Sequence, residues 1–260
     1  MNFEFDLTYK CNLACKWCNQ LCGTKYRRPD DISIEQLEKY INVVAPYIER
    51  RNSIRIVGGE PTLHPQIFEA LDIFIKILRP LTQFAINIVS NGYGQKVNRI
   101  LQQIREKYDT CDNPHLRMDM LNIRPPSSKQ FVIVTSKEYP DKYINAVHRP
   151  IFRSAIDFKS QHEIDLFAKT CEMSRVSGYK VTPIGIFVCC LGNPIATLFK
   201  LGNGFDHVPS EKEVDKQKKE ICKYCSFACD PNKTAYEAFT IVPKPEISPT
   251  HEKILKEWER

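Results

Sequence analysis

The sequence predicts an α/β fold built around a parallel sheet, on two observations. Short alternating or β-branched runs recur with helical stripes between them, and each run ends in a polar or glycine-rich loop. Strands that alternate with helices form parallel sheets through right-handed crossovers. Ligands bind such sheets at the carboxyl ends of the strands, so we expect the functional site there.

The first strand and the first helix have the clearest patterns. Apolar and polar residues alternate over residues 3–8, which predicts a strand. Ser33 and Gln36 have the spacing of a capping box, which predicts that a helix begins there. The apolar stripe of this helix consists of Ile34, Leu37, Ile41, Val44 and Ile48.

The later elements continue the alternation. In order, we predict a strand over 54–57, a helix over 67–78 that ends at Pro80, a strand over 84–89, a helix over 95–107, and strands over 117–122 and 131–136. After residue 165 the cysteines return. We therefore expect a core domain over 1–165, a small metal-dependent domain over 166–235 and a tail with a short polar helix over 236–260.

Composition and charge exclude several classes of protein. The chain has no apolar run long enough to span a membrane and no N-terminal apolar segment typical of a secretory signal. Its net charge of +6 is spread out, which does not indicate nucleic-acid binding but favours an acidic reducing partner such as flavodoxin or ferredoxin. Eleven cysteines without an export signal indicate a cytoplasmic protein with metal-binding thiols.

The first cysteine loop has the spacing Cys-x3-Cys-x2-Cys, formed by Cys11, Cys15 and Cys18. Iron–sulfur clusters are normally held by four thiolates. A cubane cluster held by only three keeps one iron available for a small molecule. Cys22 is an alternative fourth ligand, but we interpret it as a buried free thiol.

Two further motifs follow predicted strands. Gly58-Gly59-Glu60-Pro61 combines glycines that allow close backbone approach with a carboxylate that can accept from an ammonium group. Ser90-Asn91-Gly92 offers short polar side chains suited to ribose or carboxylate. Taken alone, each motif is better explained as an ordinary glycine turn.

Together, these residues resemble the radical S-adenosylmethionine superfamily, mainly over residues 3–95. The resemblance implies a partial (β/α)6, TIM-barrel-like fold in which Cys11, Cys15 and Cys18 bind a [4Fe-4S] cluster. S-adenosylmethionine would chelate the open iron, with Trp17 beside adenine. Gly58, Gly59, Glu60 and Pro61 would hold its amino group, and Ser90 and Asn91 its ribose or carboxylate. The family's glycine-rich adenine motif is missing, because no glycine lies between Gly94 and Gly178.

The second cysteine group resembles the SPASM/Twitch extension, which holds auxiliary [4Fe-4S] clusters. The short Twitch form with one cluster fits better, and we assign Cys171, Cys190, Cys222 and Cys225 as its ligands. Cys189 is an alternative to Cys190, and Cys229 is an alternative to one of the later pair. A zinc site is the alternative for the whole group.

Other candidate residues have weaker patterns. The six histidines form no spaced metal pair, and we interpret each as structural or solvated. Cys111 has no close partner in sequence and reads as a buried thiol. Arg149 and Arg153 are candidates for substrate contact, but we favour their interpretation as surface charges, and Asp119 in a predicted strand is a further candidate.

The resemblance implies an oxidoreductase that uses one-electron chemistry. Cleavage of S-adenosylmethionine gives a 5′-deoxyadenosyl radical, which removes a hydrogen atom from a small-molecule or peptide substrate. We expect the auxiliary cluster to accept an electron, so that the net reaction is an oxidation. The alternatives are a peptide-modifying maturase and, in another class, a non-catalytic electron carrier or zinc scaffold.

Overall fold

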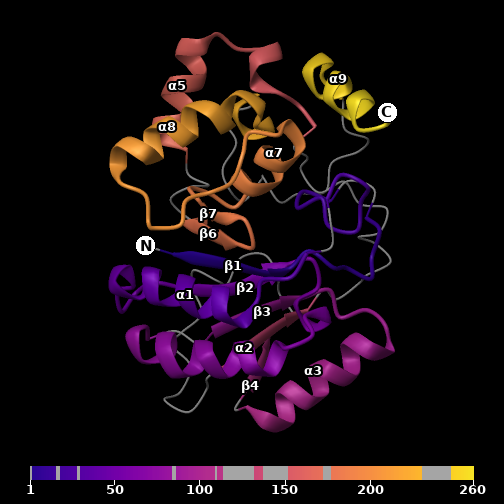
Figure 1. The fold of residues 1–260 in the computed structure, drawn as a ribbon, viewed down its shortest axis with the longest axis vertical. Helices are drawn as coiled ribbons and strands as arrows, with labels where there is room; N and C mark the ends of the chain where they lie inside the picture. Colours follow the sequence, from indigo (N-terminus) through magenta and orange to yellow (C-terminus); the bar gives the residue numbers. More distant parts are fainter. Residues whose placement is uncertain are drawn as a thin grey trace.

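The fold is described from a computed structural model of the chain. The structure describes residues 2–15, 18–27, 30–83, 86–108, 110–113, 132–136, 152–171, 177–229 and 247–260, with backbone alone for 110–113 and 132–136. Helices α1 (Ile34–Val44), α2 (Ile67–Ile73) and α3 (Gln95–Lys107) lie in the lower half of Figure 1, and the later helices lie in the upper half.

A seven-stranded sheet organises the described residues. Its strands are β1 (Phe3–Thr8), β2 (Ile54–Gly58), β3 (Ile86–Ser90), β4 (Thr110–Asn113), β5 (Val132–Ser136), β6 (Tyr179–Thr182) and β7 (Gly185–Phe187). The order is β4-β5-β3-β2-β1-β6-β7, and every neighbouring pair is parallel except the β6–β7 hairpin. This mostly parallel sheet confirms the α/β class.

The predicted strands agree with the sheet wherever the structure describes them. Strands β1, β2, β3 and β5 lie where alternating or β-branched runs predicted them. Strand β4 and the β6–β7 hairpin were not predicted, because each is only three or four residues long and shows little alternation. The strand predicted over 117–122 lies outside the described residues.

Strand β1 is buried on both faces, and the two faces differ in chemistry. Its apolar residues join the main hydrophobic core beneath α1 and α2. Glu4 and Asp6 alternate with them and are only 7% and 1% exposed. The register places Glu4 beside Arg55 on β2 and beside Lys180 on β6, so charged residues line the inner face of three adjacent strands.

Helix α1 begins where the sequence predicted, although only half of the capping box forms. The Ser33 hydroxyl accepts from the backbone N–H of Gln36 at 3.1 Å. The Gln36 side chain does not return to Ser33 but donates to the Pro183 carbonyl at 2.8 Å. The predicted apolar stripe of α1 is buried, and Gln36 ties the helix to the turn between β6 and β7.

The second helix changes its winding before it ends. Helix α2 passes into a π-helical segment, Phe74–Leu78, and then into a 3₁₀ turn, Arg79–Leu81, that contains Pro80. The wider π-turn shifts the apolar stripe. Phe74 and Leu78 are therefore fully buried, whereas Ile75 is only partly buried against the core.

A second hydrophobic core forms from the later part of the chain and from Leu21. Its main elements are α5 (Gln161–Thr170), α7 (Gly192–Phe199), α8 (Glu211–Ile221) and the 3₁₀ turns Cys222–Tyr224 and Ser226–Cys229. Capping boxes, Ser160 with Glu163 and Ser210 with Glu213, start α5 and α8. The proposed domain boundary at residue 165 falls inside α5.

The predicted polar helix of the tail is α9 (Pro249–Glu257), and it packs onto this second core. The Ser248 hydroxyl accepts from the backbone N–H of Ser154 at 2.9 Å. His251 is fully buried, and its Nδ1 lies 2.8 Å from the Ser154 hydroxyl. Just beyond α9, the Trp258 indole donates to the Leu198 carbonyl at 2.9 Å. The C-terminal residues therefore close over α7.

Candidate active site

Three motifs meet at the carboxyl ends of β1, β2 and β3. The cysteine loop follows β1, the Gly58–Pro61 motif follows β2, and Ser90 and Asn91 end β3 and begin the next loop. Because these strands are parallel neighbours, their carboxyl ends lie at one edge of the sheet. The predicted juxtaposition is therefore present in the fold.

The two glycines let the second motif lie against the cysteine loop. Gly59 N–H donates to the Thr8 carbonyl, and Glu60 N–H donates to the Lys10 carbonyl, both at 2.8 Å. A Cβ at Gly59 would collide with the Lys10 carbonyl, and Gly58 has φ +116°. Both positions therefore need glycine for physical reasons.

Glu60 is a fully buried carboxylate that the chain itself satisfies. It accepts from the Thr62 hydroxyl at 2.7 Å, from the Asn91 N–H at 2.6 Å and from the Ser90 hydroxyl at 2.9 Å. Burial raises the pKa of Glu60 above its ordinary value, and these donors oppose the rise. The carboxylate thus joins the ends of β2 and β3 instead of presenting free acceptors.

Asn91 extends this network to the cysteine loop. Its amide nitrogen lies 2.8 Å from the Asn12 side-chain oxygen and 3.8 Å from the Cys11 sulfur, and donates to both. Its side-chain oxygen accepts from the Tyr93 N–H at 2.8 Å. Asn12 in turn donates to the Tyr93 carbonyl at 2.5 Å. Every polar group of the Asn91 side chain is therefore used inside the chain.

The three cysteines of the first loop lie close enough to influence one another. Burial raises the pKa of Cys11 to about 11, with further contributions from Cys18, Glu60 and Cys15. The Cys18 N–H donates to the Cys15 carbonyl at 3.2 Å, which turns the loop back on itself. The Cys11 sulfur also accepts from the Leu13 N–H at 3.5 Å. Trp17 lies outside the described residues.

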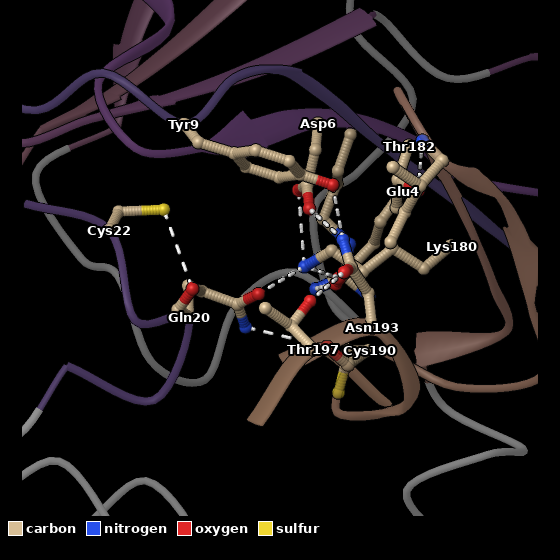
Figure 2. A network of polar contacts seen from close by, with 12 residues as sticks. Glu4, Asp6, Tyr9, Gln20, Cys22, Lys180, Thr182, Cys190, Asn193 and Thr197 are labelled. Carbon is tan, nitrogen blue, oxygen red and sulfur yellow. Dashed lines mark hydrogen bonds and ion pairs between the residues drawn. The ribbon is translucent and has the colours of Figure 1, made fainter. Parts of the chain in front are cut away.

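Cys22 is buried beside this loop, in contact with Cys18. Its thiol donates to the Gln20 carbonyl at 3.5 Å, as Figure 2 shows. A hydrogen bond with the Cys18 side chain, together with burial, raises the pKa of Cys22 well above its usual value.

The cysteines of the second group have different charged neighbours, which bears on the choice between Cys189 and Cys190 that the sequence left open. Burial raises the pKa of Cys222, Cys225 and Cys189. The charges of Cys171 and Cys189 raise the pKa of Cys222 and Cys225 further, and the charges of Cys190 and Cys171 raise that of Cys189. Cys171 and Cys189 are therefore electrostatic neighbours of Cys222 and Cys225. Cys190 acts on Cys189 and lies in the same hydrophobic core, but Glu4 and Lys180 also act on it.

Cys190 borders a buried network on the inner face of β1 and β6. Figure 2 shows this network between the first cysteine loop and the start of α7. Lys180 donates to the Gln20 side chain at 2.7 Å, and Gln20 donates to the Cys190 carbonyl at 3.4 Å. Its other members include Asp6, Arg27 and Asn193. None of these residues was predicted, because they have no common motif and come from segments far apart in sequence.

The remaining candidates are the histidines, the two arginines, Asp119 and Cys111, and those that the structure describes contact other parts of the chain. His64 Nε2 lies 2.8 Å from the Ile32 carbonyl, His251 is buried beneath α9, and His207 lies at the surface beside Asp206 and Glu213. The Arg153 guanidinium lies 4.7 Å from the ring centre of Phe158. Asp119 and Arg149 lie outside the described residues, as does the side chain of Cys111.

Two features are absent from the described residues. No group of three or more His, Cys, Asp or Glu side chains there converges to enclose a single metal ion. A [4Fe-4S] cluster needs its ligands farther apart than a single ion does, because each thiolate binds a separate iron at a separate corner. In the same part of the chain, no helix has the length and apolar character needed to cross a membrane.

Comparison with known proteins adds to this geometry. The family model of the radical SAM superfamily matches residues 6–149. Mycofactocin maturase MftC of Mycobacterium ulcerans (strain Agy99) is 37% identical over 70 residues, which are 26% of this chain and 17% of the maturase. The maturase of Mycobacterium tuberculosis (strain ATCC 25618 / H37Rv) is also 37% identical over 70 residues, 26% of this chain and 16% of that protein. Each match thus spans less than a fifth of the relative's length.

A solved structure extends the likeness to most of the chain. The crystal structure of BtrN in complex with AdoMet and 2-DOIA has a TM-score of 0.50 and 12% sequence identity. The match covers 93% of this chain and 98% of BtrN. At this identity the likeness concerns the fold alone, and it agrees with the partial TIM-barrel-like architecture that the sequence predicted.

Proposed function

This chain belongs to the radical SAM superfamily, and we propose that it cleaves S-adenosylmethionine reductively and removes a hydrogen atom from a bound substrate. The observation that carries the proposal is the hydrogen-bonded junction of three motifs. Glu60 joins the loop after β2 to the end of β3, and Asn91 joins that end to Cys11. Family membership supplies the chemical class of the reaction.

The first cysteine loop fits a [4Fe-4S] cluster by the chemistry of its donors. Cys11, Cys15 and Cys18 belong to one short loop, and burial raises the pKa of Cys11, with smaller contributions from the charges of Cys18, Glu60 and Cys15. Binding of iron would relieve this repulsion, because thiolates are the natural ligands of such clusters. The N–H groups of Leu13 and Asn91 already face the Cys11 sulfur and would stabilise a thiolate there.

The cluster, when bound and reduced, supplies the electron that splits S-adenosylmethionine. The chain's own residues would hold and orient that molecule. We propose Trp17 beside adenine, Ser90 and Asn91 near ribose or carboxylate, and the backbone of Gly58–Pro61 at the amino group. Glu60 and the Asn91 side chain act by positioning, because groups of the chain already occupy their polar atoms.

We propose that residues 166–235 hold an auxiliary [4Fe-4S] cluster of the Twitch type. The electrostatic neighbours Cys171, Cys189, Cys222 and Cys225 would be its ligands, so that Cys189 takes the place first assigned to Cys190. All four lie in or beside the second hydrophobic core, where exclusion of water protects a cluster.

An oxidation is the net reaction that this arrangement favours. Loss of one hydrogen atom, followed by loss of one electron and one proton, is a two-electron oxidation of the substrate. The auxiliary cluster would receive that electron, and an external reductant such as flavodoxin or ferredoxin would supply the electron for the first step. A peptide maturase is the second candidate, favoured by the partial likeness to mycofactocin maturase MftC.

Anaerobic turnover tests the proposal. Full-length protein reconstituted with iron and sulfide and supplied with a one-electron reductant, such as reduced flavodoxin, should convert S-adenosylmethionine to 5′-deoxyadenosine. Joint replacement of Cys11, Cys15 and Cys18 by alanine should abolish this product. Cys22→Ala is the matched control in the same loop and should keep both iron and product. Equal product from the triple variant, or zinc in place of iron, contradicts the proposal and favours the carrier or scaffold.

Paired variants test the auxiliary ligands. Cys189→Ala should lower the iron content by about 4 atoms per chain, the content of one cubane cluster. Cys190→Ala should keep that iron. The reverse pattern would restore the first assignment of Cys190. Substrate conversion should stop in Cys222→Ala while slow formation of 5′-deoxyadenosine continues, and full conversion in that variant would contradict the role of the second cluster.

A further inference from the structure

The network beside Cys190 contains several charged side chains that are buried together. It lies on the inner face of β1 and β6, against the loop of residues 18–27 and the start of α7 (Figure 2). The sheet register alone brings Lys180, Glu4 and Arg55 into one row across β6, β1 and β2. Burying so many charges costs free energy unless each is paired.

The row itself contains two ion pairs. Lys180 Nζ lies 3.1 Å from Asp6 Oδ1 and 3.8 Å from Glu4, and its side chain is 1% exposed. Arg55 Nη1 lies 3.1 Å from Glu4. Burial acts to lower the pKa of Lys180, but Asp6 and Glu4 outweigh it and raise that pKa above the usual value. Lys180 is therefore charged in the folded protein.

Arg27 adds a third cation to the same network. It is 7% exposed, and its guanidinium carbon lies 4.2 Å from the ring centre of Tyr9. Nη2 donates to the side-chain oxygens of Asn193 at 3.0 Å and Thr197 at 3.1 Å. Asn193 also donates to the Tyr9 hydroxyl at 2.5 Å. These contacts fix the guanidinium plane and leave Nε and Nη1 for other partners.

Buried donors without acceptors concentrate in this network. Among the described residues, eight buried side-chain atoms have no hydrogen-bond partner, and four of them are here: Arg27 Nε, Arg27 Nη1, Arg55 Nε and Asp6 Oδ1. The last of these is nevertheless ion-paired with Lys180. Folded proteins pair nearly all buried polar groups, so a cluster of exceptions indicates a missing partner. Because the three remaining atoms are N–H donors, that partner must supply acceptors.

The balance of charge gives the sign of the missing partner. Within the described part of the network, Lys180, Arg27 and Arg55 face two carboxylates, Glu4 and Asp6. One positive charge is therefore left over in a buried place. A neutral ligand would satisfy the donors but would not balance this charge, whereas a carboxylate or phosphate does both.

We propose that the substrate carries an oxyanion, a carboxylate or a phosphate, that binds Arg27 in the network between the first cysteine loop and α7. This inference rests on the proposed function, since it places the substrate on the inner face of the sheet. Arg27 is then a binding and specificity residue, held in place by Asn193, Thr197 and the Tyr9 ring.

Calorimetric titration of the reconstituted full chain tests the proposal. The probes are inorganic phosphate, acetate and the neutral polyol myo-inositol, added at constant ionic strength, first without S-adenosylmethionine and then with it at saturation. Phosphate or acetate should bind, and which of them binds tighter identifies the oxyanion. Arg27→Gln should weaken that binding by about tenfold or more, the usual loss for a charged hydrogen-bond partner.

Matched variants separate a site from a general charge effect. Lys25→Gln removes one positive charge from the same loop, but Lys25 is exposed and pairs with Glu259. It should bind the anion as the native chain does. Arg27→Lys keeps the charge with fewer donors and should bind more weakly than native but more tightly than Arg27→Gln. If the arginine variants do not fold, the binding of the three probes to the native chain still distinguishes a site for an oxyanion from a site for a neutral ligand.

Several results would overturn the proposal. These are binding of myo-inositol with neither anion bound, equal loss of binding in Lys25→Gln and Arg27→Gln, and phosphate binding that disappears when S-adenosylmethionine is added. The last result would assign the site to the methionine carboxylate. Formation of 5′-deoxyadenosine in the same samples is a separate readout. Cleavage without anion binding contradicts this inference alone, and anion binding without cleavage contradicts the proposed function alone.

Discussion

Glu60 shows how one buried carboxylate can organise a site from three strands. It accepts hydrogen bonds from Thr62, Ser90 and Asn91, and Asn91 reaches Cys11. The residue type was recognised from its motif, but its role was expected to be an acceptor for the methionine amino group. The structure shows that the chain's own donors reach it, because the β2 and β3 loops close over it.

Glu60→Gln should therefore destabilise the protein even without a ligand. The amide would direct N–H groups at donors that now face a carboxylate, at a cost of about 1–3 kcal/mol. Urea unfolding followed by fluorescence measures this loss. Glu69→Gln is the control, because Glu69 is exposed and only accepts from Gln66 on the same helix. Equal stability of the two variants would show that Glu60 is not the junction described here.

Gly59→Ala should disturb the cysteine loop specifically. The new Cβ would meet the Lys10 carbonyl, one residue before Cys11, so the loop must move away from β2. We expect loss of iron after reconstitution. Gly202→Ala is a useful comparison, because a Cβ there meets nothing within 4 Å and only the backbone at φ +96° is strained. Iron retention in Gly59→Ala would contradict the close packing of the two motifs.

At the scale of elements, helix α9 depends on a histidine that folding keeps neutral. Burial lowers the pKa of His251 to about 3, although the Asp157 charge acts in the opposite direction. The unfolded chain takes up a proton below the ordinary histidine pKa of about 6.5, and the folded chain does not until about pH 3. Stability therefore falls as pH drops through this window.

The expected effect is about tenfold in the unfolding equilibrium per pH unit within that window. Comparison of urea midpoints at about pH 5 and about pH 7 should show the loss in the native chain and little of it in His251→Gln. His207→Gln is the control, because His207 is exposed and hydrogen bonds to Asp206 and Glu213 raise its pKa. An unchanged acid sensitivity in His251→Gln would exclude this histidine as its source.

The sequence predicted a helix or strand correctly where a pattern within a few residues was enough to determine it. The Ser33 cap, the stripe of α1 and strands β1 to β3 follow from spacing within a few residues. The π-turn after α2 and the β6–β7 hairpin beside β1 were not predictable, because tertiary contacts select them. Gln36 is an example: its side chain was expected to hydrogen-bond to Ser33, but it donates to the Pro183 carbonyl, which is far away in sequence.

The same limit applies to the site. Cysteine spacing and the Gly-Gly-Glu-Pro motif identified the first loop because their residues are adjacent in sequence. Arg27, Lys180 and Asn193 come from three segments and meet only in the folded chain. The proposal of Cys189 in place of Cys190 also depends on the fold, because different charged neighbours act on the two thiols.

At the scale of the whole molecule, the inner face of β1 separates two groups of cysteines. The first group lies in the loop after β1, and the second lies in and around the second hydrophobic core. The network of Asp6, Lys180 and Gln20 reaches from the loop after β1 to the Cys190 carbonyl, next to Cys189 (Figure 2). We expect about 8 iron atoms per reconstituted chain, and about 4 would contradict the auxiliary cluster.

The central claim is that the first cysteine loop presents an iron to S-adenosylmethionine. Electron paramagnetic resonance of the anaerobically reduced protein tests it most directly, with Cys222→Ala used to remove the second signal. We predict that adding S-adenosylmethionine shifts the signal of the remaining cluster and that 5′-deoxyadenosine then accumulates. An unchanged signal in protein that holds its iron would contradict the claim.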